Sequence, residues 1–202
     1  MRLKLYLTLT LLAARRPFDI RSKPGRAWAE LLGLPDPDIN GARRIADALS
    51  WLGRAKLLRL DRNPGLPPDV TLLSPSGDGR GYGWSTSRYI RLPLDFWTQG
   101  WILALSGTAV AALLVLLEIQ GGKSPDNPPW LTGEQRKRYG LSDDTWTRAT
   151  KELKGYGLLN VRRIPQGKEF DYRRLRNTYW VDLQRLASPA PELPTTVRAA
   201  GT

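Results

Sequence analysis

Apolar and polar residues repeat along the chain in two blocks, and the second block has the clearest pattern. Helical spacing of apolar residues predicts helices over 105–120 and 142–154, and Gly121 and Gly122 are placed to end the first of them. Alternating apolar and polar residues predict a strand over 158–165 and a return strand over 177–183, joined by a charged loop.

Shorter signals complete this second block. Residues 88–97 begin like a strand that Pro93 interrupts, and 128–132 form a short extended piece. Thr132 and Gln135 have the spacing of a capping box, which predicts a helix over 133–140. Ser142 is expected to cap the next helix and Gly155 to stop it. The predicted order is helix, short strand, helix, helix, strand, loop, strand.

The first block follows the same plan. Its expected elements are helices over 3–14, 27–34 and 40–54 and strands over 18–21, 57–62 and 70–73. Aligning Leu57 and Leu58 with Leu158 and Leu159 also pairs the apolar positions of the preceding helices, namely Ile45 with Trp146, Ala48 with Ala149 and Leu52 with Leu153. One structural unit is therefore predicted to occur twice.

Composition sets the expected domain boundaries. Gly and Ser dominate 74–87, which is predicted to be a linker between a first domain at 1–73 and a second at 88–187. The Pro-, Ala- and Thr-rich segment 188–202 is predicted to be a disordered tail. The apolar start of the chain and the apolar run 101–117 are broken by Thr, Ser and Gly, so we expect core helices there rather than a signal peptide or a membrane span.

Charge indicates the kind of partner. The chain carries 31 Lys and Arg against 19 Asp and Glu, a net charge of +12, and this excess favours a polyanion such as nucleic acid. Residues 1–87 hold 14 basic and 8 acidic side chains and residues 88–186 hold 16 and 10, so both blocks are basic. A basic but inert surface is the plainer alternative.

The sequence also restricts the chemistry. It has no Cys and no His, which excludes disulfides, zinc fingers, thiolate catalysis and histidine acid–base chemistry. Carboxylates are not paired in an apolar context that would tune their acidity. We therefore expect a non-enzymatic protein with no cofactor and no metal.

Both blocks resemble winged-helix domains of the MarR- and GntR-like kind. The signature is carried by Gly140, Leu141, Ser142, Thr145, Ala149, Leu153, Gly157, Leu158 and Leu159. Residues 89–117 are also similar to the start of winged-helix domains in plasmid replication initiators, which often carry two in tandem. The resemblance covers about residues 3–186. It implies an α+β fold with two winged-helix domains in tandem and a bacterial, cytoplasmic, nucleoid-associated protein that binds double-stranded DNA.

The function implied first is transcription regulation. A plasmid or mobile-element replication initiator uses the same domains, and a winged-helix scaffold that docks proteins is a further alternative. In the winged-helix arrangement the third helix enters the major groove and a basic wing contacts the phosphate backbone. No membrane partner is expected.

Helical spacing divides the third helix of the second block into two faces. Trp146 shares a face with Ala149 and Leu153, so it is predicted to lie in the core. The opposite face is expected to contact bases through Asp144, Thr147, Arg148 and Lys151. Asp143 suits the positive end of the helix dipole. Asp144 can either orient Arg148, four residues later, or accept a hydrogen bond from cytosine.

Cations around this helix are expected to contact the DNA backbone or, in the hairpin, to protect a sheet edge. The predicted backbone contacts are Arg136, Lys137, Arg138, Ser142, Arg162, Arg163, Lys168, Arg173, Arg174 and Arg176. The first block offers Arg43, Arg44, Arg59 and Arg62, but its loop 63–69 is short and proline-rich. We expect that block to bind DNA weakly, to dock another protein or to self-associate.

Overall fold

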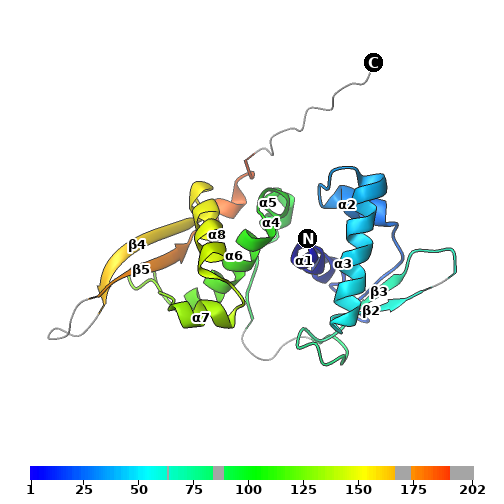
Figure 1. Ribbon diagram of the computed structural model, residues 1–202, viewed down its shortest axis with the longest axis horizontal. Helices are drawn as coiled ribbons and strands as arrows, with labels where there is room; N and C mark the ends of the chain where they lie inside the picture. The colour runs from blue at the N-terminus through cyan, green and yellow to red at the C-terminus, as the bar shows by residue number, and fades with distance from the viewer. Residues whose placement is uncertain (63, 84–88, 167–173, 192–202) are drawn as a thin grey trace, which may run out of the picture. The chain divides into compact units, whose positions relative to one another are not determined.

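The computed structural model describes residues 1–62, 64–83, 89–166 and 174–191, and it divides into two units, Met1–Arg88 and Tyr89–Thr202 (Figure 1). Each unit combines helices with a small antiparallel sheet, so the predicted α+β class is confirmed. No described helix is both long enough and apolar enough to cross a membrane.

Unit 1, Met1–Arg88, places its helices before a hairpin. Its elements are α1 (Arg2–Leu12), β1 (Asp19–Ile20), α2 (Gly25–Leu31), the π-helical turn η1 (Pro37–Gly41), α3 (Ala42–Arg54), β2 (Leu58–Asp61) and β3 (Asp69–Leu72). The sheet order is β1-β3-β2, with β3 antiparallel to both neighbours. The short β1 therefore extends the hairpin into a three-stranded sheet.

The core of unit 1 lies between the helices and this sheet. Its fully buried side chains include Leu5 of α1, Trp28 of α2, and Ile45 and Leu52 of α3. Gly41, the last residue of η1, lies tight against α2, because a Cβ there would lie 2.8 Å from the Cβ of Ala29. A side chain at this position would force the two helices apart.

The segment 74–87, predicted to be a linker, begins as part of unit 1. Ser74 N–H donates to the Arg80 carbonyl at 2.8 Å, and Leu73 bridges to Gly81. The Tyr82 ring packs edge-on against Phe18 with centroids 5.0 Å apart. Gly and Ser here form a turn because Leu73 continues the sheet and Tyr82 covers the core, so composition alone misassigned residues 74–82.

Unit 2, Tyr89–Thr202, has the longer helices and the longer hairpin. Its elements are α4 (Asp95–Thr98), α5 (Trp101–Ala104), α6 (Gly107–Gln120), α7 (Gly133–Arg138), α8 (Asp143–Gly155), β4 (Leu159–Gln166), β5 (Arg174–Val181) and the 3-10 helix η2 (Leu183–Ala187). Strands β4 and β5 are antiparallel from Leu159↔Val181 outward, and Trp130 bridges to Thr178 on the other side of β5. The hairpin projects beyond the helices of its own unit (Figure 1).

Helix α6 is the centre of unit 2. It is apolar on nearly every side and packs against α8 and β5. It begins at Gly107, two residues after the predicted start, because Ser106 Oγ accepts a hydrogen bond from Ala109 N–H at 3.1 Å and caps the helix. The Ser106 N–H and hydroxyl in turn donate to the Glu152 carboxylate of α8, at 2.7 and 2.6 Å. This pair of bonds attaches α8 to the beginning of α6.

Three boundaries of the second block differ from prediction. Residues 89–93 form no strand, and the short helix α4 follows Pro93, whose carbonyl accepts from Phe96 N–H at 3.0 Å. The apolar run 101–117 is divided into α5 and α6, because Ser106 takes an extended conformation to cap α6. The predicted tail begins as ordered chain, since the buried Trp101 indole donates to the Ser188 carbonyl at 3.0 Å and so fixes it.

Helices α3 and α8, each of which precedes a hairpin, end in the same kind of turn. Leu57 N–H donates to the Leu52 carbonyl and Leu158 N–H to the Leu153 carbonyl, each at 3.0 Å. The turn needs a left-handed residue, which is Lys56 (φ 56°) in unit 1 and Gly157 (φ 73°) in unit 2. Gly155, the predicted stop, is the last residue of α8. The left-handed turn two residues later reverses the chain.

This shared turn allows a matched test of backbone strain. Lys56→Gly should stabilise unit 1 by about 1 kcal/mol, because a non-glycine residue is strained in the left-handed region. Gly157→Ala should destabilise unit 2 by about the same amount, for the same reason. Urea unfolding followed by circular dichroism measures both changes. Two effects of the same sign would contradict the assignment of strain to this turn.

Candidate nucleic-acid interface

Helix α8 presents one polar face to solvent. Asp144, Thr147, Arg148 and Lys151 are all exposed, and together they are called the α8 face below. Ser142 begins the helix as predicted, with its Oγ accepting a hydrogen bond from Thr145 N–H at 3.2 Å. The Ser142 hydroxyl also donates to Thr145 Oγ1 at 2.9 Å, so Ser142 has a structural role at the helix start.

The opposite side of α8 is held firmly by the core. Trp146, Ala149 and Leu153 are buried, which confirms the predicted core position of Trp146. The Trp146 indole N–H donates to the Tyr179 hydroxyl at 3.2 Å, and the two rings meet edge-on with centroids 5.4 Å apart. Because Tyr179 belongs to β5, this contact fixes α8 against the hairpin.

Asp144 and Arg148 form an ion pair along the α8 face. This pairing is one of the two roles predicted for Asp144. Both side chains stay largely exposed, at 69% and 75%, so the pair adds little to folding stability. Its effect is geometric, because it restricts the Arg148 guanidinium on the surface of the helix.

Asp143 has a partner that the sequence did not indicate. Its carboxylate lies 3.0 Å from the guanidinium of Arg136, whose side chain is only 23% exposed. Arg136 Nε is buried and has no hydrogen-bond partner among the described residues. Arg136 therefore connects α7 to the start of α8, and this half-buried ion pair removes it from the freely available cations.

The rest of α7 keeps its positive charge accessible. Lys137 and Arg138 are exposed, as a backbone contact requires. Partial desolvation raises the pKa of the neighbouring Tyr139 phenol, with the Glu118 carboxylate adding to the effect. The phenol thus stays neutral at ordinary pH and does not offset the charge of α7.

The hairpin separates its predicted contacts between two faces. In an antiparallel pair, directly opposite residues share a face. Arg163 pairs with Asn177 on the face that continues from the buried Tyr179, whereas Arg162 pairs with Thr178 on the opposite face. Arg176 also lies on that opposite face, with its guanidinium 3.7 Å from the centroid of the Trp130 ring.

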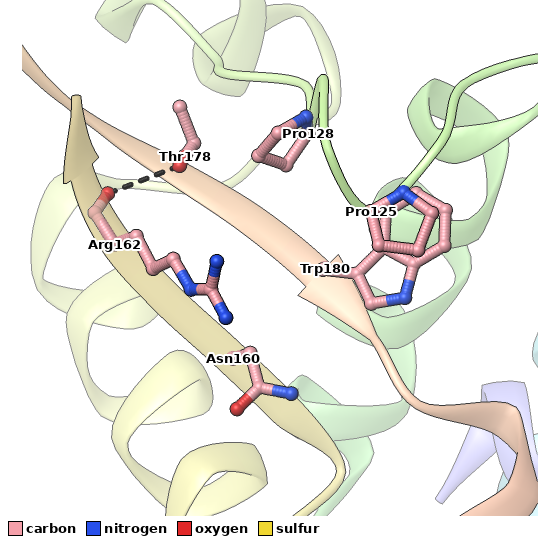
Figure 2. A pocket seen from close by; sticks show the side chains of 6 residues that line it. All are labelled: Pro125, Pro128, Asn160, Arg162, Thr178 and Trp180. Atoms are coloured by element: carbon pink, nitrogen blue, oxygen red, sulfur yellow. Dashed lines mark hydrogen bonds between the residues drawn. The ribbon is translucent and has the colours of Figure 1, made fainter. Parts of the chain in front are cut away.

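A small pocket of about 110 Å³ lies beside Arg162. Figure 2 shows the Arg162 side chain extending toward Asn160 and Trp180, with Pro125 and Pro128 from the loop before α7 on the other side. The Thr178 hydroxyl donates to the Arg162 carbonyl at 3.1 Å and ties the two strands together here. Arg162 is thus directed away from the side of the sheet that packs against α8.

The remaining predicted contacts of unit 2 belong to the end of the hairpin. Arg174 begins β5 and pairs with Gln166 in the strand register. Lys168 and Arg173 lie outside the described residues. Contact of Arg174, Lys168 and Arg173 with the DNA backbone therefore stays a prediction.

The predicted cations of unit 1 are spread over two elements. Arg43 and Arg44 are exposed on α3, and Arg62 is exposed just after β2. Arg59 is 3.2 Å from the Asp61 carboxylate, so its charge is partly neutralised. The four predicted cations of unit 1 therefore come from α3 and from β2 and the residue after it.

Sequence reasoning missed two residues that organise the interface. The Trp130 ring packs against the Arg176 guanidinium. In the sequence, Trp130 is marked by its place two residues before Thr132, the predicted start of a helix. Glu152 anchors α8 on Ser106, but nothing in its spacing indicates a partner 46 residues away. Among the described residues, no cluster of acidic side chains could hold a metal ion.

Unit 2 thus exposes the α8 face, the cations Lys137 and Arg138 of α7, and Arg163 on the helix-facing side of the hairpin, together with the carboxylates of Glu134, Asp143 and Asp144. No protein-family model, curated protein or solved structure matches the chain, so its function has to be inferred from these residues and their geometry.

Proposed function

We propose that the chain is a non-enzymatic, double-stranded DNA-binding protein in which both units are winged-helix domains. The order of elements supports this, because each unit places a helix, an extended segment and two further helices before an antiparallel hairpin. One observation carries the proposal for unit 2. The α8 face gathers Asp144, Thr147, Arg148 and Lys151 on one exposed surface, and the opposite side of the same helix is locked into the core.

Helix α8 is the element that enters the major groove. Its exposed residues recur every three or four positions, so they follow the line along which a helix meets base edges. Arg148 can donate to guanine O6 and N7, and Asp144 can accept from a cytosine amino group. Arg148 and Asp144 together can therefore recognise both bases of one G·C base pair.

The phosphate contacts come from the surroundings of α8. Lys137 and Arg138 are exposed on α7, and Arg163 lies on the helix-facing side of the hairpin. Arg162 and Arg176 point to the other side, so a duplex lying against α8 meets Arg163 before either of them. Arg136 supports the start of α8 and does not bind phosphate in this proposal.

Within this function we favour transcription regulation over replication initiation. Both use the same interface, and the arrangement of the selected sites separates them. A regulator selects one site or a palindrome, whereas an initiator is expected to act on iterated repeats beside its own gene. The sites themselves come from selecting bound sequences out of a random duplex pool.

The Asp144–Arg148 pair is the sharpest test of base reading. Arg148→Ala should cost roughly 1–3 kcal/mol on the best selected duplex and should relax the preference at one position of the motif. Asp144→Asn should raise the affinity for all duplexes by removing repulsion, and should lower the specific-to-nonspecific ratio about tenfold. Competition binding against the selected site and a scrambled duplex measures both effects.

Arg26→Ala is the matched control for this test. Arg26 forms an exposed ion pair with Glu30 at the same four-residue spacing on α2 of unit 1. Its loss should change neither the motif nor the ratio. A selected motif that is unchanged by Arg148→Ala would show that α8 of unit 2 is not the reading helix.

A further inference from the structure

Unit 1 carries a groove at the position where unit 2 carries its polar face. The groove has a volume of about 590 Å³ and lies between α3, the start of α2 and the loop that joins β2 to β3. Its floor is apolar, formed by residues that include Ala46, Leu49, Leu60, Leu66 and Pro68. Leu66 is 61% exposed and adds its apolar side chain to that of Pro68 on this floor.

Two of the four positions of the α8 face carry smaller side chains in α3. When the shared turns are superposed in sequence, Ala46 of α3 corresponds to Thr147 of α8, and Ser50 corresponds to Lys151. The other two positions of the α8 face keep a charge, because Arg43 corresponds to Asp144 and Asp47 to Arg148. The hairpin loop adds Leu66 and Pro68 beside Ala46 and Ser50. Helix α3 thus offers fewer long polar side chains to base edges, which are recognised mainly through hydrogen bonds, and more apolar area beside Arg43.

The rim of the groove is positive. Lys23, Arg43 and Arg62 line it, and no carboxylate does. None of these three side chains makes an ion pair with any residue that the structure describes. Cations around an apolar floor complement a ligand that combines apolar side chains with carboxylates.

We propose that this groove binds a short segment of another protein in which large apolar residues are flanked by Asp or Glu. Such a segment places its apolar side chains against Leu49, Leu60 and Leu66 and its carboxylates beside Arg43 and Arg62. A second copy of this chain is a poorer occupant, because two molecules of net charge +12 repel each other. The proposal does not depend on DNA binding by unit 2.

The test begins with a random peptide library displayed on phage. The library is selected on the full-length chain at physiological salt and depleted on the variant Leu66→Asp, which changes an exposed side chain and should fold normally. We expect the enriched peptides to combine large apolar residues with Asp or Glu. A synthetic peptide of the consensus sequence, and its copy with every acid changed to Lys, then serve as the measured ligands.

Two neighbouring arginines give the matched pair of variants. Arg43 lines the groove, whereas Arg44 is exposed on the same helix but does not. Arg43→Glu should weaken the acidic peptide about tenfold or more, and Arg44→Glu should leave it nearly unchanged. Fluorescence anisotropy with the labelled peptide measures these changes, and the Lys-substituted peptide should not bind.

The outcomes that overturn the proposal are distinct. Failure to enrich any peptide, enrichment of peptides without acids, or equal effects of Arg43→Glu and Arg44→Glu would each contradict it. Loss of duplex affinity in Arg43→Glu with no loss in Arg44→Glu would make the groove a DNA contact. Concentration-dependent dimers in sedimentation velocity that Leu66→Asp abolishes would make the occupant a second copy.

Discussion

The affinity of the chain for any duplex should fall about a thousandfold as the salt concentration rises from 50 to 200 mM. Each cation that neutralises a phosphate releases a counterion, so the logarithm of the binding constant falls linearly with the logarithm of the salt concentration. With about six phosphate contacts the slope is expected to be about −5. The chain's net charge of +12 supplies enough cations for this, even with Arg136 and Arg176 engaged within the protein.

Variants of α7 locate these contacts on the structure. Replacing Lys137 and Arg138 together by Ala should make the slope shallower by about 2, because each contributes about one released ion. Arg15 and Arg16 form a comparable exposed pair in unit 1, and replacing them by Ala should leave the slope unchanged. A titration with a scrambled duplex measures all three slopes. A slope near zero in the unmodified protein would exclude binding through the phosphate backbone.

Much of the fold was predictable because local signals agree with the tertiary structure. Thr132 and Ser142 each cap the helix that their sequence position indicates, with hydroxyl oxygens accepting the expected backbone N–H. The alignment of the two blocks also predicted matched buried positions, and Ile45 and Trp146 are both in the core of their own unit. These features depend on neighbours a few residues away, which the sequence displays directly.

What the sequence misassigned depends on contacts between distant residues. The Gly/Ser-rich segment after Leu73 reads as a linker, but Tyr82 packs on Phe18, which lies 64 positions earlier in the chain. The predicted tail is held at Ser188 by the indole of Trp101, 87 residues away. Composition cannot anticipate which distant core group needs a partner.

The candidate site shows the same division. The exposure of the α8 face followed from helical periodicity, and the Asp144–Arg148 pair followed from its spacing. The inward turn of Arg136 did not, because it depends on how α7 meets the start of α8. The separation of Arg162 and Arg163 onto opposite faces of the hairpin follows from the alternation of side chains along a strand.

Trp146→Ala should have the largest effect on stability, lowering the free energy of unfolding of unit 2 by about 3–5 kcal/mol. Trp146 is only 2% exposed and joins α8 to Tyr179 of β5, so its removal leaves a cavity where the helix meets the hairpin. It also leaves the Tyr179 hydroxyl without the indole donor. Because small domains are stable by only about 5–15 kcal/mol, unit 2 should be close to unfolding at ordinary temperature.

Two variants separate the sources of this loss. Tyr179→Phe removes the hydrogen bond but keeps the ring contact, and should cost about 1 kcal/mol. Trp51→Ala removes a tryptophan that is 37% exposed on α3 and contacts the Arg2 guanidinium, and should cost about 1 kcal/mol in unit 1.

Chemical denaturation followed by far-ultraviolet circular dichroism measures these changes without relying on the deleted indole. The unit 1 transition should be unchanged in Trp146→Ala, because the two units have separate cores. Duplex binding should weaken in step with the unfolded fraction of unit 2, since the α8 face exists only while Trp146 holds the other side of the helix. A loss near 1 kcal/mol, equal to that of Trp51→Ala, would mean that α8 is positioned by other contacts, of which the Glu152–Ser106 pair is the first to test.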